Sequence, residues 1–238
     1  MSQILYSLND KDLAFPHPEH ALQEPNGLLA IGGDLSSARL IRAYRQGIFP
    51  WYSDHDPILW WSPDPRAIIY CQQIRVNKTL KKFVKKSPYH ITINQAFEQV
   101  INNCSDAPFR NDDTWILPEM LNAYLELHKL GIAHSIEVWE QGHLVGGLYG
   151  VAINGAFSGE SMFYRKPNAS KIALLALCQH LQTINIELID CQLQNPFLQS
   201  MGAIEISRAD YLKHLNKLVQ QAIDDDFWCP KELQLNYG

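Results

Sequence analysis

The 238-residue sequence lacks several features that would place it in a class at once. Its longest apolar run, from Ile172 to Cys178, is too short to span a bilayer, and its first residues do not resemble a secretory signal. Its five cysteines form no Cys-x-x-Cys pair and its nine histidines no His-x-x-x-His pair. We therefore expect a cytoplasmic protein with no disulfide framework, no metal site and no bound cofactor.

The sequence also lacks an excess of positive charge, because its 20 Lys and Arg are outnumbered by 25 Asp and Glu and the formal net charge is −5. This argues against indiscriminate binding to nucleic acid. One stretch is an exception and contains Lys78, Lys81, Lys82, Lys85 and Lys86. Helical spacing places these lysines opposite Val76, Leu80 and Phe83, which predicts an amphipathic helix capped by Asn77 and ended by Pro88. The lysine face is either a solvated surface or a contact for a phosphate backbone.

Three of the six tryptophans lie within one short, proline-rich segment, at Trp51, Trp60 and Trp61. These aromatic rings cannot all pack along one regular element. They indicate either a stacking surface for a flat ligand such as a nucleobase or a structural corner against the core.

The sequence suggests two domains, a small one over residues 1–64 and a larger one over residues 65–238. The first is rich in Pro and Gly, with one predicted helix over residues 36–46. We interpret Gly27, Gly32 and Gly33 as turn residues and residues 60–63 as the linker between the domains.

The larger domain is predicted to be a mixture of helices and strands. Hairpin signals at residues 141–142 and 154–155 join three strands into a meander. The predicted strands begin at Ile91 and cover 135–139, 143–153, 156–164, 187–193 and 203–207, and the predicted helices cover 95–103, 118–130, 169–183 and 196–201. This order predicts an α+β protein whose larger domain has an acetyltransferase-like (GNAT-like) fold, by analogy of fold alone.

Polar side chains interrupt two apolar strands of this domain. The alternation of a strand predicts that Asp190 and Gln192 share one face, with Cys191 on the other. Glu160 lies in similar apolar company in a neighbouring strand. These groups either satisfy loop backbone or form one shared reaction site. Covalent catalysis is disfavoured because no serine or cysteine is flanked by an obvious base.

Six segments together resemble the leucyl/phenylalanyl-tRNA–protein transferase family across nearly the whole chain. They are residues 24–35, 44–51, 57–66, 133–139, 159–163 and 190–192. The resemblance implies a cytoplasmic bacterial enzyme, active as a monomer, that moves Leu or Phe, and less readily Met, from aminoacyl-tRNA to proteins with N-terminal Arg or Lys, marking them for degradation. It also implies a small N-terminal domain followed by an acetyltransferase-like domain.

The resemblance also implies roles for individual residues. The reaction centre corresponds to Asp190, Gln192 and Glu160. The residues that hold the terminal adenosine correspond to Trp51 and Trp115, with Tyr44 and Tyr124 nearby. The pocket for the transferred side chain corresponds to Leu148, Phe157, Leu174, Leu177 and Ile189. The lysines at 78, 81, 82, 85 and 86 correspond to the family's basic cluster for the tRNA stem. The resemblance leaves Trp60 and Trp61 without a binding role, and we expect them to pack at the linker that sets the two domains against each other.

An aminoacyl ester is already activated, so its aminolysis needs alignment more than a strong base. We expect Gln192 to orient the reacting groups, Asp190 to hold Gln192 or relay a proton, and Glu160 to offset positive charge on the acceptor. Phe197 replaces an expected His, and Leu177 stands where an aromatic can occur, so the amino-acid preference is open.

Two other functions remain open. A coenzyme A-dependent N-acetyltransferase of the same fold needs a glycine-rich turn before the helix that follows the meander, but residues 165–171 contain no glycine. A tRNA-binding protein without catalysis explains the lysines and tryptophans but not the acidic residues.

Overall fold

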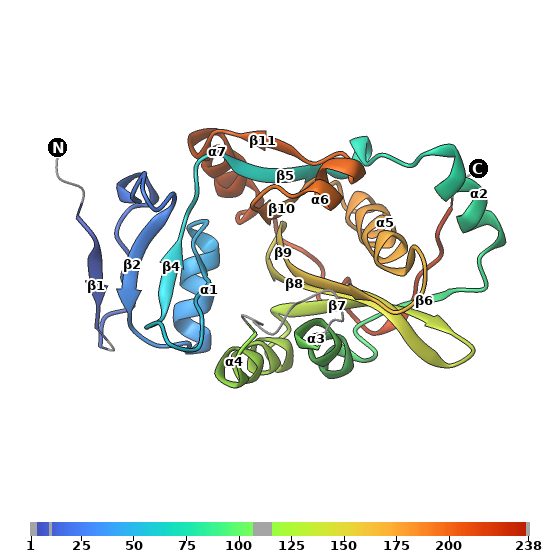
Figure 1. Ribbon diagram of the computed structural model, residues 1–238, viewed down its shortest axis with the longest axis horizontal. Coiled ribbons are helices and arrows are strands. Elements are labelled where there is room, and N and C mark those ends of the chain that lie inside the picture. The colour runs from blue at the N-terminus through green and yellow to red at the C-terminus, as the bar shows by residue number, and fades with distance from the viewer. Residues whose placement is uncertain (1–3, 10, 107–115, 237–238) are drawn as a thin grey trace.

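The computed structural model describes residues 4–9, 11–106 and 116–236. Within these ranges the chain forms a four-stranded sheet, an eight-stranded sheet and seven α-helices (Figure 1). The prediction of a mixed helix-and-strand protein is confirmed. Among the residues described, no helix combines the length and the apolar character needed to cross a membrane.

The smaller sheet is built from the N-terminal part of the chain and has the strand order β1-β2-β4-β3. Its strands are β1 (Tyr6–Leu8), β2 (Leu28–Gly32), β3 (Phe49–Pro50) and β4 (Leu59–Trp61). Helix α1 (Ser37–Arg45) begins where the Ser36 hydroxyl accepts the Arg39 N–H, close to the predicted start. Gly27, Gly32 and Gly33 have positive φ, as turn residues do, but Gly27 and Gly33 flank strand β2 and Gly32 ends it, and this strand was not predicted.

The expectation that residues 60–63 form a linker is wrong for the first two, because Trp60 and Trp61 belong to a strand. Trp60 lies in strand β4, between β2 and β3, and its side chain is completely buried. Its indole N–H donates to the Gly32 carbonyl at 2.9 Å, and the Phe15 ring packs edge-on at 4.9 Å. Trp60 is therefore a core residue, and the core to which it belongs also includes residues of the larger part.

The larger sheet has the order β11-β5-β10-β9-β8-β7-β6-β12. The bounds of its strands are β5 Arg66–Tyr70, β6 His90–Ile93, β7 Ala133–Glu140, β8 His143–Ile153, β9 Ala156–Tyr164, β10 Leu188–Gln192, β11 Ile204–Ile206 and β12 Lys231–Glu232. The meander β7–β8–β9 is confirmed, with Gln141, Gly142 and Asn154 at positive φ in its two turns. Only β9 and β10 pair in parallel in this sheet.

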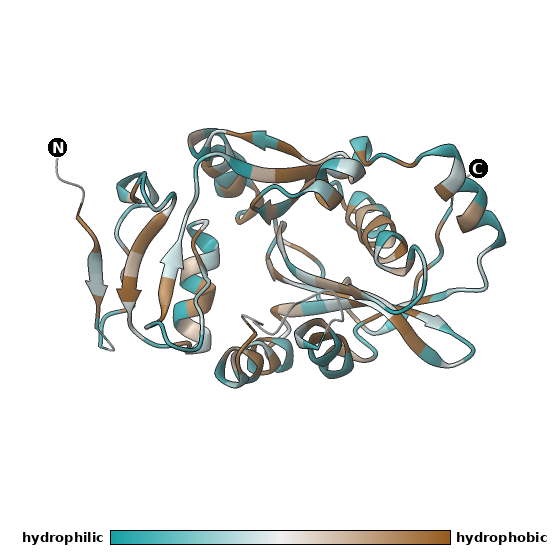
Figure 2. Cartoon of the chain, in the orientation of Figure 1, coloured by the Kyte–Doolittle hydropathy of each residue, from teal (hydrophilic) through white to brown (hydrophobic). Residues whose placement is uncertain are grey.

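Helices cover both faces of the larger sheet. They are α2 (Lys78–Lys86), α3 (Phe97–Ser105), α4 (Pro118–Lys129), α5 (Ala169–Gln182), α6 (Pro196–Met201) and α7 (Arg208–Leu218), with short 3-10 turns η1 (Pro18–His20) and η2 (Cys71–Gln73). Helices α3 and α4 pack on one face and α5 on the other (Figure 1). Apolar residues gather on the strands and on α5, whereas the turns are mostly hydrophilic (Figure 2). Two apolar cores result, one on each side of the sheet.

The two sheets fall on either side of the predicted boundary at residue 64. One apolar core crosses that boundary, because it includes Tyr44 and Trp60 from the N-terminal part and Tyr124 and Tyr149 from the larger part. Helix α1 also contacts α4 and β8 directly. The division into two domains stays a prediction.

Candidate active site

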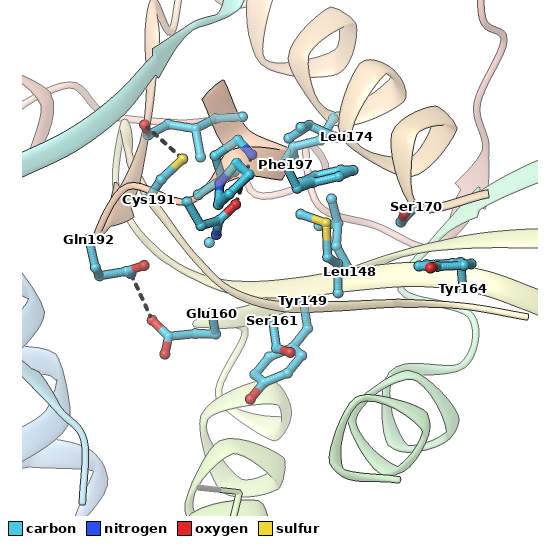
Figure 3. A pocket seen from close by; sticks show the side chains of 17 residues that line it. Leu148, Tyr149, Glu160, Ser161, Tyr164, Ser170, Leu174, Cys191, Gln192 and Phe197 are labelled. Carbon is cyan, nitrogen blue, oxygen red and sulfur yellow. Dashed lines mark hydrogen bonds between the residues drawn. The ribbon is translucent and has the colours of Figure 1, made fainter. Parts of the chain in front are cut away.

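An apolar cavity of about 550 Å³ opens between strands β8–β10 and helices α5 and α6 (Figure 3). Four of the five residues predicted to surround a transferred side chain line it, namely Leu148, Leu174, Leu177 and Ile189. The fifth, Phe157, is not a lining residue. It is buried, and its ring lies 5.6 Å from that of Trp228.

Further residues line the cavity that the sequence analysis did not assign to it. They are Tyr149, Gly159, Ser161, Met162, Tyr164, Ser170, Cys191, Asn195, Pro196, Phe197 and Leu198. Ser161 and Met162 directly follow Glu160 in β9, so their place in the sequence beside that acid could have predicted that they line the cavity. The half-buried Phe197 ring comes from α6, and it faces the cavity because β10 and α6 are joined by only three residues.

One end of the cavity is polar. The Gln192 side-chain amide and the Glu160 carboxylate point toward each other, with Nε2 donating to Oε1 at 3.4 Å (Figure 3). The Tyr124 hydroxyl donates to the other Glu160 oxygen at 2.9 Å, and it lies 2.5 Å from the Tyr44 hydroxyl. Residues from α1, α4, β9 and β10 therefore form one hydrogen-bonded chain that ends at the cavity.

The ionisation of Glu160 is shifted into the neutral range. Burial raises the pKa of Glu160 to about 7, although hydrogen bonds from Tyr44 and Tyr124 oppose the shift. Burial also raises the pKa of both phenols well above the usual value, so they stay protonated donors. At neutral pH this carboxyl is divided between its two forms, which suits a group that exchanges a proton.

Asp190 does not share a face with Gln192 as the alternation predicted. A bulge interrupts the pairing of β10 with β5 between these residues, and Gln192 has a φ of 56°. As a result Cys191 and Gln192 line the cavity, whereas Asp190 does not. The extra residue of the bulge turns the Gln192 side chain toward the cavity. The regular alternation of side chains along a strand does not predict this change of face.

The Asp190 carboxylate is instead buried among donors. Arg66 binds both of its oxygens at 2.7 Å, Tyr211 donates to one oxygen at 2.8 Å, and the Ser158 hydroxyl lies 3.1 Å from the same oxygen. The Gln192 backbone N–H donates to the other oxygen at 3.1 Å. Burial alone raises the pKa of Asp190, but the Arg66 charge and these hydrogen bonds hold it below its usual value. Asp190 is therefore an ionised anchor whose oxygens are already occupied.

The residues predicted to hold adenosine have different environments. Trp51 is 44% exposed and follows β3, and its ring lies 5.7 Å from that of Trp61, whose indole N–H donates to the Trp51 carbonyl at 2.6 Å. Trp61 thus contacts both the ring and the backbone of Trp51. Tyr44 and Tyr124 are buried and present no free face. Trp115 lies outside the described residues.

The lysine-rich segment is a helix, as predicted. The Asn77 side chain accepts the Leu80 N–H at 2.8 Å and starts α2, and Leu80 is buried beneath it. All five lysines, at positions 78, 81, 82, 85 and 86, are exposed. Helix α2 lies at the opposite end of the long axis from the N-terminal sheet (Figure 1). Its contact with tRNA stays a prediction.

Two family models match this chain. The leucyl/phenylalanyl-tRNA protein transferase model matches residues 68–216, and the model of the N-terminal domain of that transferase matches residues 33–64. Together they include α1, the Glu160–Gln192 pair and the lysine helix.

Curated relatives agree with the family models. A leucyl/phenylalanyl-tRNA–protein transferase of Colwellia psychrerythraea is 60% identical over 238 residues, covering 98% of this chain and 99% of that protein. The corresponding protein of an Enterobacter species is 55% identical over 229 residues, with 96% and 97% covered. That of Pseudoalteromonas atlantica is 52% identical over 224 residues, with 94% and 96% covered.

The protein is therefore an aminoacyltransferase. More narrowly, the chain belongs to the leucyl/phenylalanyl-tRNA protein transferase family. Among solved structures, L-PGS from Bacillus licheniformis is 12% identical with a TM-score of 0.39, over 70% of this chain and 53% of that chain. A score this low supports no conclusion about fold or function, so the acetyltransferase-like fold stays a prediction.

Proposed function

We propose that this protein transfers Leu or Phe, and less readily Met, from aminoacyl-tRNA to the α-amino group of proteins that begin with Arg or Lys. The modified proteins would be marked for degradation in the bacterial cytoplasm, and the enzyme would act as a monomer with an acetyltransferase-like larger domain. One observation supports this reaction above all. An apolar cavity ends at a carboxyl group whose pKa is about 7, with an amide beside it.

The transferred side chain would occupy the apolar cavity. Leu148, Leu174, Leu177 and Ile189 offer only hydrocarbon surface there. Such a surface distinguishes substrates by size and shape, and one methylene changes binding by about 1–3 kcal/mol. Unbranched Cβ groups such as those of Leu, Phe and Met would enter most easily. Met162 of β9 and Phe197 of α6 add further apolar lining.

The bond-making step would take place at the polar end of the cavity. The neutral α-amino nitrogen of the acceptor attacks the ester carbonyl carbon, a C–N bond forms, and the C–O bond to the terminal ribose breaks. Glu160 accepts the proton that the nitrogen loses, and the proton then passes to the departing ribose oxygen. Gln192 orients the amine or the carbonyl by hydrogen bonding. In its ionised form, Glu160 also attracts the positive charge carried by the N-terminal Arg or Lys of the acceptor.

Of the two roles open to Asp190, the structure supports holding rather than relaying. A proton acceptor needs a free lone pair directed at the substrate. Glu160 lines the cavity, whereas Asp190 does not. The two Asp190 oxygens accept five hydrogen bonds, two from Arg66 and one each from Tyr211, Ser158 and the Gln192 backbone N–H, which occupies the lone pairs of a carboxylate. Asp190 would therefore fix the position of Gln192.

The tRNA would be held at two further places. Trp51 offers an exposed ring for the terminal adenine, and Trp115 is the proposed partner on the other face of the base. The exposed lysines of α2 would contact the phosphates of the stem. Buried Tyr44 and Tyr124 would act indirectly, by fixing Glu160 through their hydroxyl groups.

The rival functions explain less. A coenzyme A-dependent acetyltransferase would bind pyrophosphate on a glycine-rich turn before α5, but residues 165–171 contain no glycine there, and α5 begins after Asn168 without a side-chain cap. A tRNA-binding protein without catalysis leaves the Glu160–Gln192 pair unexplained.

The test is to mix the protein with Leu-tRNA or Phe-tRNA and a peptide that begins with Arg, and to record the peptide mass. We expect one added Leu or Phe. An otherwise identical peptide with an acetylated amino terminus should gain nothing, because it lacks the nucleophile. An added acetyl group in the presence of acetyl-coenzyme A, or no addition at all, would overturn the proposal in favour of a rival.

A further inference from the structure

A buried ion pair joins three distant parts of the chain behind the proposed site. Arg66, the first residue of β5, donates from Nε and Nη2 to the two oxygens of Asp190 and from Nη1 to the Gly47 carbonyl at 3.2 Å. Its guanidinium lies between two rings, 4.9 Å from the centre of Phe49 and 4.5 Å from that of Tyr211. The cluster is closed to water, because Arg66 and Asp190 are nearly fully buried.

The ion pair controls the position of Gln192, which follows Asp190 by two residues at the end of β10. Gln192 has a left-handed backbone, with a φ of 56°, which is unfavourable for a residue with a side chain. Its N–H is tied to Asp190 Oδ1 at 3.1 Å, and its side chain meets Glu160 at 3.4 Å. The direction of the Gln192 amide therefore depends on where the Asp190 carboxylate is held.

We infer that Arg66 and Tyr211 are positioning residues for aminoacyl transfer, acting through Asp190 to fix the Gln192 amide against Glu160. The inference rests on the proposed function. Arg66 fixes the plane of the carboxylate by its two-point contact, and the Tyr211 hydroxyl fixes its rotation from α7. Because Arg66 also holds Gly47 and Phe49, the same cluster connects the reaction centre to the strand that precedes Trp51.

A purely structural role is the alternative for this cluster. Buried ion pairs are weak evidence of a contribution to stability, because desolvation offsets much of their attraction. A structural role would lower activity only by unfolding part of the protein, independently of Gln192. A positioning role needs Gln192 to be present. A double-mutant cycle separates these two cases.

The test uses Tyr211→Phe, which removes one oxygen and keeps the ring over Arg66. In steady-state transfer from Phe-tRNA to an Arg-peptide, we expect kcat to fall about tenfold while the KM for Phe-tRNA stays within about twofold. In a Gln192→Ala background, the same substitution should lower the rate less than about twofold. The matched control is Tyr70→Phe, which removes a hydroxyl that contacts His214 of α7 without touching Asp190, and it should leave the rate unchanged.

An equal loss in both backgrounds, or a loss confined to KM, would overturn the inference. If Tyr211→Phe does not fold, Ser158→Ala replaces it, since the Ser158 hydroxyl contacts the same Asp190 oxygen and the same dependence on Gln192 is expected. Failure of the wild-type protein to transfer any residue would refute the proposed function itself. Transfer by the wild type with independent effects of Tyr211 and Gln192 would refute only the positioning role.

Discussion

Replacement of Glu160 by Gln should change both the rate of transfer and its dependence on pH. The amide keeps the shape of the side chain and still accepts a hydrogen bond from Tyr124, but it cannot accept a proton. The wild-type carboxyl, whose pKa is about 7, is ionised to about 9% at pH 6 and about 91% at pH 8. The variant loses this titration completely.

The size of the effect follows from these fractions. A positioned general base contributes about 10²–10⁴-fold to a rate, and the lower end is expected for an ester that is already activated. At pH 8 the wild type should exceed Glu160→Gln about a hundredfold, which is about 2.7 kcal/mol. At pH 6 the excess should shrink to about tenfold, because about ten times less of the carboxylate is present.

The assay is kcat/KM for transfer of Phe to an Arg-peptide, measured for both proteins from pH 6 to 8.5. The ratio of the two values removes the titration of the substrate amine, whose reference pKa is about 7.7–8.0 and which is common to both. Glu98→Gln, at an exposed position of α3, is the matched control and should leave the rate unaffected at every pH. A ratio that stays constant with pH would refute the assignment of proton acceptance to Glu160.

Four further perturbations separate binding, packing and ionisation. Trp51→Ala should lower kcat/KM for aminoacyl-tRNA about 5- to 150-fold with little change in urea stability, whereas Trp60→Ala should lower the free energy of unfolding by about 3–5 kcal/mol. Lys81→Ala with Lys85→Ala should weaken tRNA binding and reduce the slope of log K against log salt by about 1.5, as titrations at several salt concentrations would reveal. Burial lowers the pKa of His134 from its ordinary value of 6.5 to about 3. When the pH is lowered below 6.5, only the unfolded chain gains this proton, so the free energy of unfolding decreases as the pH decreases. Between pH 6 and pH 5 the free energy of unfolding, measured with urea, should fall by about 1.2 kcal/mol less in His134→Gln than in the wild type, and equal losses would contradict this account.

Local patterns predicted the elements whose signals are local. The meander follows from alternating side chains and from Gln141-Gly142 and Asn154-Gly155 at its turns. Helix α2 follows from its lysine spacing and the Asn77 cap. These features need no knowledge of the rest of the fold, because each rests on contacts between residues close in sequence.

Strands β4 and β5 and helix α7 were missed for a different reason. Trp60 and the prolines near it suggested a linker, although β4 and β5 each belong to a sheet completed by distant segments. In α7 only Tyr211 and Leu215 are buried, so its apolar pattern is weak. Here pairing and packing with distant parts of the chain decide the structure.

The candidate site was likewise predicted in part. Glu160 and Gln192 were expected near each other and do form a hydrogen bond, whereas Asp190 was assigned to the wrong face. The bulge and the left-handed Gln192 have no signature in the sequence, because glycine is absent there. The contact of Arg66 with Asp190 joins residues 124 positions apart and has no local signal at all.

In the proposed complex the cavity holds the transferred side chain, and the carbonyl lies at Gln192 and Glu160. The most direct measurement is a crystal structure of the protein with a non-hydrolysable amide analogue of 3′-phenylalanyl-adenosine. We predict the phenyl ring among Leu148, Leu174 and Ile189, with the analogue's carbonyl within hydrogen-bonding reach of the Gln192 amide. A phenyl ring bound outside this cavity, or a carbonyl remote from both polar groups, would contradict the claim.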